Sequence, residues 1–225
     1  KSLRDGDMRA FYDEARTALS DTESYVIVLD SRFNQVLNTR RAYGEALGTT
    51  AEPVSAQAAL DSGKPVISNG FLGRTAQKWV FNIILPWTPK DRDPLLLVLT
   101  QNAETLSNSL SMEDLRGGWN AVIVDNNSMV MASTLMSSDI GKPFLLSEAA
   151  AGDGPVRRTV TNDGKHYELI VKPSALSGWR VVLWSERDAV RRPLERTLRM
   201  LLLGGAAMIA VGGVAAWLPR RQVST

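Results

Sequence analysis

Two stretches of this chain carry the same pattern: YVIVLDSRFNQVLNT at residues 25–39 and NAVIVDNNSMVMAS at residues 120–133. In each stretch an apolar, β-branched run meets a polar turn that begins with an aspartate, Asp30 or Asp125, and a second apolar run follows. Two such runs joined by a short polar turn predict a β-hairpin. The recurrence of the hairpin 95 residues later predicts a duplicated unit.

The repeat continues beyond the hairpins. Residues 165–173, KHYELIVKP, align with residues 78–86, KWVFNIILP, at an offset of 87, so the second copy is the shorter one in its middle. A further strand follows each of these, at 95–100 and at 179–185. We therefore expect an α+β fold in which each copy is a mainly antiparallel sheet with a short helix on one side.

Helical patterns flank and connect the two copies. Residues 2–20 have the apolar spacing of an amphipathic helix, and residues 103–115 show a similar spacing. Helical character resumes at 186–199, where Pro193 predicts a kink. Residues 200–218 contain no charged side chain and no proline. As a helix they would span about 28 Å, which fits the hydrocarbon core of a bilayer and predicts a transmembrane helix.

The distribution of charge restricts the class of partner. Residues 187–225 hold seven arginines against two carboxylates, whereas residues 1–186 hold more acidic than basic side chains. The basic residues thus flank the predicted membrane span and form no nucleic-acid footprint, so we expect no nucleic-acid partner. The absence of cysteine from the sequence removes disulfides, thiol catalysis and cysteine-ligated metal sites.

The order and spacing of several short motifs along the chain resemble those of a known protein family. The motifs are GDMRAFY at 6–12, LNTR at 37–40, SGKPV at 62–66, IGKP at 140–143, LSGWR at 176–180 and RPL at 192–194. With the repeat and the predicted membrane helix, they resemble the double Cache (PDC-type) periplasmic sensor region of bacterial transmembrane receptors. The chain looks most similar to the sensors of alphaproteobacterial HWE-type histidine kinases.

The resemblance implies tandem PAS-like domains in a definite order. The expected parts are an N-terminal helix (1–23), a membrane-distal Cache domain (24–105), a connecting helix (106–118), a membrane-proximal Cache domain (119–185), a signalling helix (186–199), a transmembrane helix (200–218) and a cytoplasmic tail (219–225).

The same resemblance implies a function in signal transduction. We expect a homodimeric sensor in the bacterial inner membrane whose periplasmic distal domain binds a small molecule, an organic acid or an amino acid, without a cofactor. The second membrane helix would pass the signal to an output domain, most simply a histidine kinase, so the chain itself is not expected to be an enzyme. A diguanylate cyclase or chemoreceptor output, a membrane-tethered periplasmic hydrolase, and a scaffold for a periplasmic protein remain alternatives.

Candidate ligand-binding residues lie in the first copy, near the expected mouth of its pocket. An arginine can bind a carboxylate with two hydrogen bonds, and aromatic side chains with a few polar groups are typical of small-ligand clefts. A solvated loop arginine and ordinary core packing of the aromatics are the competing interpretations. The candidates are Arg40, Tyr43, Ser68, Asn69, Phe71, Trp79, Phe81 and Asn82.

Nothing in the sequence favours a catalytic or metal site. No GxSxG, P-loop or HExxH motif is present. His166 is the single histidine and has no carboxylate partners at metal-ligand spacing. Asp30 and Asp125 are best explained as turn residues, because the side chain of an aspartate can accept a hydrogen bond from the backbone N–H two residues later and so stabilise a turn.

Overall fold

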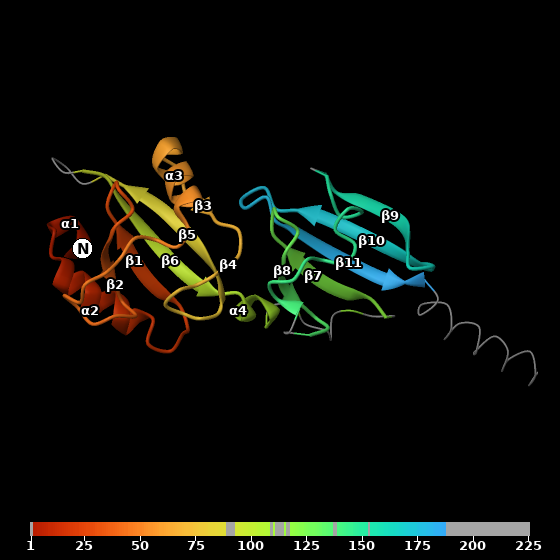
Figure 1. The fold of residues 1–225 in the computed structure, drawn as a ribbon, viewed down its shortest axis with the longest axis horizontal. Helices are drawn as coiled ribbons and strands as arrows, with labels where there is room; N and C mark the ends of the chain where they lie inside the picture. Colours follow the sequence, from red (N-terminus) through yellow and green to blue (C-terminus); the bar gives the residue numbers. More distant parts are fainter. Residues whose placement is uncertain are drawn as a thin grey trace, which may run out of the picture.

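The chain folds into two antiparallel sheets that lie in separate halves of the molecule (Figure 1). The computed structural model describes residues 2–88, 93–108, 110, 115, 118–136, 139–152 and 154–187. We call residues 2–102 the first module and residues 118–187 the second module. The two antiparallel sheets expected from the repeat are confirmed.

The first module contains a six-stranded sheet and three helices. The strand order is β2-β1-β6-β5-β3, and β4 also pairs with β5. Its elements are α1 (Ser2–Asp5), α2 (Met8–Ala18), β1 (Tyr25–Leu29), β2 (Gln35–Asn38), α3 (Pro53–Ser62), β3 (Val66–Ile67), β4 (Phe71–Leu72), β5 (Trp79–Trp87) and β6 (Leu95–Asn102).

The second module contains a five-stranded sheet in the order β8-β7-β11-β10-β9. A short helix, α4 (Glu104–Ser107), follows the first module along the chain. The strands of the second module are β7 (Asn120–Val124), β8 (Val130–Ser133), β9 (Val156–Asn162), β10 (Lys165–Pro173) and β11 (Arg180–Glu186).

The two predicted hairpins have the same internal geometry. Asp30 Oδ1 accepts hydrogen bonds from the backbone N–H of the second and fourth residues after it, and Asp125 Oδ1 does the same in its own turn. Phe33 and Ser128, both three residues after the aspartate, adopt positive φ of 65° and 61°. Both aspartates therefore build their turns, as the sequence predicts.

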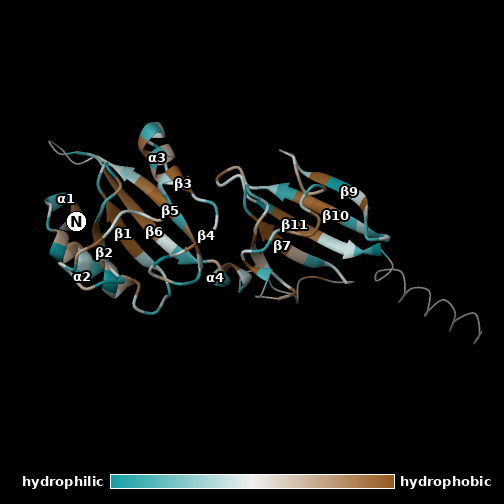
Figure 2. Ribbon diagram, viewed as in Figure 1, coloured by the Kyte–Doolittle hydropathy of each residue, from teal (hydrophilic) through white to brown (hydrophobic). Residues whose placement is uncertain are grey.

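Each face of the first sheet is covered by one helix (Figure 1). Helix α3 buries Ala56 and Ala59 against the face that includes Ile27 and Leu29. Tyr12 of α2 packs on the opposite face with Val28 and Leu37. Figure 2 shows that the hydrophobic residues concentrate on the strands, as expected for a sheet packed on both faces.

Two features differ from the sequence prediction. The expected helix over 2–20 is broken into α1 and α2, because Gly6 adopts a positive φ of 80° that a helix cannot contain. In the described part of the second module no helix takes the place of α3; residues 145–150 form consecutive turns instead. The second copy is shorter in this region, so it has fewer residues for a helix.

Two strands were not predicted. Strand β4 has only two residues, too few for a pattern, and β9 lies at the sheet edge with mostly exposed side chains, so its sequence lacks apolar alternation.

The membrane-associated parts of the prediction are outside the structural description. None of the described helices is long and apolar enough to span a bilayer. The predicted signalling helix beyond Arg187, the predicted span 200–218 and the tail 219–225 lie outside the described residues, as does most of the connecting helix beyond α4.

Candidate functional site

A small cavity lies between the sheet of the first module and two of its loops. It has a volume of about 30 Å³. The sheet contributes residues from β1, β2, β4, β5 and β6, and the loops that contain residues 49–51 and 73–75 contribute the others. The lining residues are Tyr25, Ile27, Gln35, Thr49, Thr50, Ala51, Phe71, Gly73, Arg74, Thr75, Asn82 and Thr100.

The floor of this first-module cavity is polar and internally hydrogen-bonded. Thr100 donates a hydrogen bond of 2.8 Å to Asn82 Oδ1, and both residues are almost fully buried. Burial raises the pKa of Tyr25, and a hydrogen bond with Thr100 opposes that rise. The phenol therefore stays neutral at physiological pH and can both donate and accept.

Arg74 is the one charged residue in the lining, and it is exposed to solvent. A volume of about 30 Å³ holds roughly one water molecule. A ligand with several non-hydrogen atoms therefore needs more room than the cavity has in this structure.

Two of the sequence-predicted candidates line this cavity, and a third is hydrogen-bonded to one of them. Phe71 and Asn82 line it directly. Ser68 is fully buried, and its Oγ accepts a 2.9 Å hydrogen bond from the backbone N–H of Asn82. These three residues come from β4, β5 and the segment that follows β3, so pairing of β3 and β4 with β5 brings them together.

Two candidates are not among the residues that line the cavity, although Arg40 contacts Tyr25, which does line it. The Arg40 guanidinium lies 4.8 Å from the centre of the Tyr25 ring and donates to the Glu23 carbonyl. Tyr43 packs edge-on against Tyr12, with ring centres 5.4 Å apart, on the side of α2. Both follow β2, which carries the chain toward α2 and away from residues 71–75.

The remaining candidates face the second module. Trp79 and Phe81 share one face of β5, as their alternation predicts, and both join an apolar cluster with residues of the second module. The Phe81 ring lies 5.0 Å from that of Trp179. Asn69 Oδ1 accepts hydrogen bonds from the backbone N–H and the side-chain amide of Asn126.

The sequence analysis did not identify most of the polar lining. The missed residues are Tyr25, Gln35, Thr49, Thr50, Arg74, Thr75 and Thr100. One signal was available: Thr100 and Asn102 continue the buried face that Leu96 and Val98 begin on β6. Polar residues at buried strand positions must find partners, and such positions often mark a site.

One segment connects the cavity with the second module. We call residues 68–72 the bridging segment. It contains the buried Ser68 and the cavity residue Phe71, and between them the backbone N–H of Gly70 donates a 3.0 Å hydrogen bond to Asp125 Oδ2. Asp125 is fully buried in the turn of the second hairpin. The bridging segment therefore joins the wall of the cavity to a hydrogen bond between the modules.

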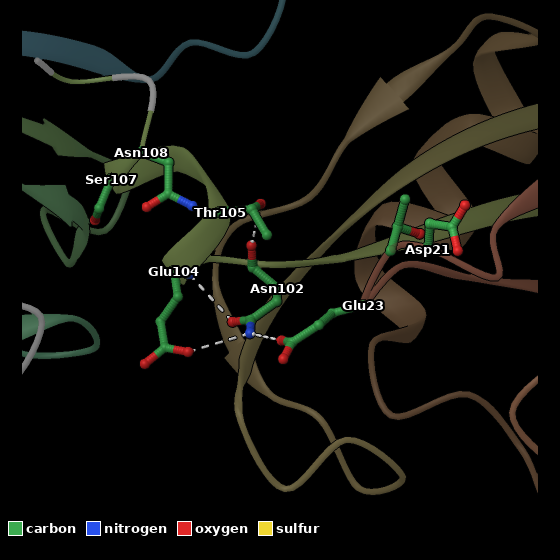
Figure 3. A pocket seen from close by; sticks show the side chains of 8 residues that line it. Asp21, Glu23, Asn102, Glu104, Thr105, Ser107 and Asn108 are labelled. Atoms are coloured by element: carbon green, nitrogen blue, oxygen red, sulfur yellow. Dashed lines mark hydrogen bonds between the residues drawn. The ribbon is translucent and has the colours of Figure 1, made fainter.

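A larger, open pocket of about 590 Å³ lies where β6 leads into α4 (Figure 3). The Asn102 amide donates to Glu23 and to Glu104, and Lys78 forms ion pairs of 3.1 and 3.5 Å with the same two carboxylates. The hydrogen bond from Asn102, followed by that from Lys78, lowers the pKa of Glu23. The hydrogen bond to Glu23 in turn raises the pKa of Lys78. These side chains pair with one another, and their hydrogen bonds and ion pairs connect the segment before β1 with the start of α4.

Metal binding has no structural support in the part of the chain that is described. No group of three or more His, Asp or Glu side chains is placed there to hold an ion. His166 Nδ1 is 2.8 Å from the Thr161 hydroxyl, on the neighbouring strand β9.

Comparison with known proteins gives a fold but no sequence family. The sequence matches no protein-family model and no curated relative. Among solved structures, the ligand-binding domain of Mlp24 with asparagine has a TM-score of 0.60 at 14% identity, covering 84% of this chain and 80% of that one. The extracellular domain assigned to a histidine kinase, rpHK1S-Z16, has a TM-score of 0.61 at 15% identity, with coverage of 81% and 79%.

A third similar structure is the ligand-binding domain of the Pseudomonas fluorescens chemoreceptor CtaA in complex with L-leucine. Its TM-score is 0.56 at 17% identity, and the match covers 78% of this chain and 75% of that one. The chain therefore has the fold of the extracellular ligand-binding domains found in chemoreceptors and sensor histidine kinases.

Proposed function

We propose that the chain is the extracytoplasmic sensor region of a transmembrane receptor and that it binds a small molecule in the first-module cavity. The observation that carries this proposal is the buried polar floor formed by Asn82 and Thr100 beneath the bridging segment. Concave sites in which a few convergent polar groups stand beside apolar and aromatic side chains are typical of small-ligand binding. The fold shared with extracellular ligand-binding domains supports the same function.

The lining favours a ligand that carries a carboxylate. Arg74 supplies the only formal charge among the lining residues, and hydroxyls and amides supply the rest of the polar groups. A guanidinium binds a carboxylate through two parallel hydrogen bonds. Because no acidic side chain lines the cavity, a ligand amine would lack an ionic partner there. We therefore propose an organic acid first and an amino acid second, although the Mlp24 and CtaA domains hold asparagine and leucine.

The bridging segment offers a mechanism for signalling. A ligand that displaces Phe71 shifts the population of states in which Gly70 contacts Asp125, in proportion to its differential affinity for those states. Strand β11 begins beside this contact, since Arg180 donates to the Asp125 carbonyl, and it ends at Glu186. The proposed signal continues from there through the predicted signalling helix and inner-membrane span of a dimer to a histidine kinase output domain.

Thermal unfolding of the full 225-residue chain in detergent tests the ligand site. Organic acids and amino acids are screened, and any ligand that prefers the native state raises the melting temperature. At a free concentration of about 100 times Kd the stabilisation is about 2.7 kcal/mol, which corresponds to a rise of roughly 5–10 °C at this chain length.

Two arginine variants locate the site. Arg74→Ala is expected to abolish the rise caused by a carboxylate ligand. Arg157→Ala on β9, which removes an exposed arginine paired with Glu168, is expected to leave it unchanged. An equal rise in both variants would contradict the first-module site, and the absence of a rise with every acid and amino acid would contradict the proposed ligand class.

A further inference from the structure

The second module repeats the fold of the first, and it also has a position equivalent to that of the first-module cavity. In the first module the N–H of Gln35 donates to the carbonyl of Gly48, and in the second the N–H of Val130 donates to that of Lys142. The neighbouring β-bridges are equivalent as well: Asn34 forms an antiparallel bridge with Thr49 in the first module, and Met129 forms one with Pro143 in the second. Residues 143–145 therefore cover the second sheet where residues 49–51 cover the first.

The strand register extends the equivalence to the floor. Thr100 lies between Tyr25 and Asn82 in the first sheet. Trp184 lies between Asn120 and Leu169 at the matching position in the second sheet. The second module therefore has the indole of Trp184 where the first-module cavity has the hydroxyl of Thr100.

A pocket of about 230 Å³ occupies this place in the second module. We call it the second-module pocket. Where the first-module cavity has Gln35, Thr49, Thr50 and Thr100, it has Val130, Pro143, Phe144 and Trp184. Its apolar walls are Val122, Val130, Pro143, Phe144, Leu145 and Trp184.

We propose that the second-module pocket binds a small apolar molecule, an aromatic ring or a branched hydrocarbon group. Dry apolar cavities of about 150 Å³ bind benzene, so the observed volume has room for a substituted ring. Phe144 and Trp184 supply aromatic surfaces, which favour edge-on or offset contacts with a bound ring. This site goes beyond the proposed sensing of a polar ligand and does not depend on it.

The mouth of the pocket supports the same ligand class. Leu135 and Leu145 line it and are 51% and 62% exposed, so a bound hydrocarbon would remove apolar surface from water. Asp139 and Lys142, the two charged residues in the lining, form an ion pair of 3.7 Å with each other. The two opposite charges give the lining no net charge, which favours an uncharged ligand.

Methyl NMR of the full chain in phosphatidylcholine nanodiscs tests the proposal, with toluene as the probe. We expect the methyl signals of Val122 and Val130 to shift and to saturate with free toluene, while those of Val28 in the first module stay in place. Because the protein signals are observed, toluene dissolved in the bilayer does not contribute to the readout.

Two matched variants decide whether the shifts report this pocket. Leu145→Glu places a charge at the mouth and is expected to raise the half-saturation concentration about tenfold. Leu176→Glu makes the same change at a 75% exposed leucine outside the pocket and is expected to have no effect. Both positions are exposed, so neither substitution is expected to prevent folding.

Three results would overturn the proposal. Shifts that rise linearly without saturation would show partitioning only, and equal effects of the two glutamate variants would place binding elsewhere. Shifts of Val122 and Val130 that follow protein concentration in the absence of toluene would show that a second copy of the chain covers the pocket.

Discussion

At the scale of single residues, Asp125 differs from its repeat partner in one contact. Both Asp30 and Asp125 bind two N–H groups of their own turn, but only Asp125 also accepts the N–H of Gly70 from the other module. Asp30 uses its second oxygen for the Asn34 amide. A comparison of the two aspartates therefore separates turn formation from the contact between modules.

We predict that Asp125→Ala destabilises the protein more than Asp30→Ala does. Both substitutions remove a turn acceptor, but the first also leaves the Gly70 N–H without a partner, which costs about 1–3 kcal/mol. The extra loss appears as a larger fall in the urea midpoint at an unchanged m-value. Equal midpoints for the two variants would show that the Gly70 contact contributes nothing to stability.

At the scale of elements, the turn that contains Gly141 packs closely against β5. Gly141 has a positive φ of 81°, and a Cβ at this position would overlap the Trp79 indole. Gly44 has a similar φ of 84°, and a Cβ there would meet nothing. The two glycines share a backbone requirement and differ only in their neighbour.

Gly44→Ala is predicted to cost about 1–2 kcal/mol, the penalty of a left-handed conformation for an L-residue. Gly141→Ala carries the same penalty and a further 1–3 kcal/mol or more from overpacking against Trp79. Calorimetric unfolding of both variants measures the difference. If the two losses were the same, the close approach of this turn to β5 would not occur in solution.

The elements also show which parts of the fold the sequence could predict. The hairpins and β5, β6, β10 and β11 follow from apolar alternation and turn chemistry, which are local. The site residues were only partly predictable, because a cavity forms where β1, β5, β6 and two loops converge. The sequence pattern predicts Arg40 at the mouth of the pocket, whereas in the structure its guanidinium lies over the ring of the lining residue Tyr25 and is not itself in the lining. Such directions depend on tertiary packing and leave no local pattern.

At the scale of the whole molecule, the group of Glu23, Lys78, Asn102 and Glu104 holds α4 to the first module. Figure 3 shows Glu23, Asn102 and Glu104 of this group. The lowered pKa of Glu23 means that its contribution is present above the unfolded value of about 4.5 and is lost as pH falls through the folded value. The raised pKa of Lys78 means that its contribution is present below about 10.5 and is lost as pH rises through the folded value. The ion pair thus acts between these limits.

Lys78→Met is predicted to lower the melting temperature slightly at pH 7, by no more than a few degrees, because the pair is exposed. The difference from the unsubstituted chain should shrink as the pH is lowered from 7 to 3, because Glu23 gains protons as the pH falls below its unfolded value of about 4.5 toward the lowered folded pKa. It should also shrink in 1 M salt, which screens exposed charges. Scanning calorimetry at the two pH values makes the comparison. A difference that persisted at pH 3 would indicate lost packing of the lysine stem instead of lost charge.

The hydrogen bond between Thr100 and Asn82 has a consequence for discrimination among solutes. Thr100 and Asn82 already satisfy each other through this hydrogen bond, so neither of the bonded groups is left without a partner before a ligand binds. An incoming molecule gains only the difference between its own hydrogen bonds and those it displaces. If a ligand binds at the proposed site, a solute with only one or two polar groups is therefore expected to bind more weakly than one that also engages Arg74.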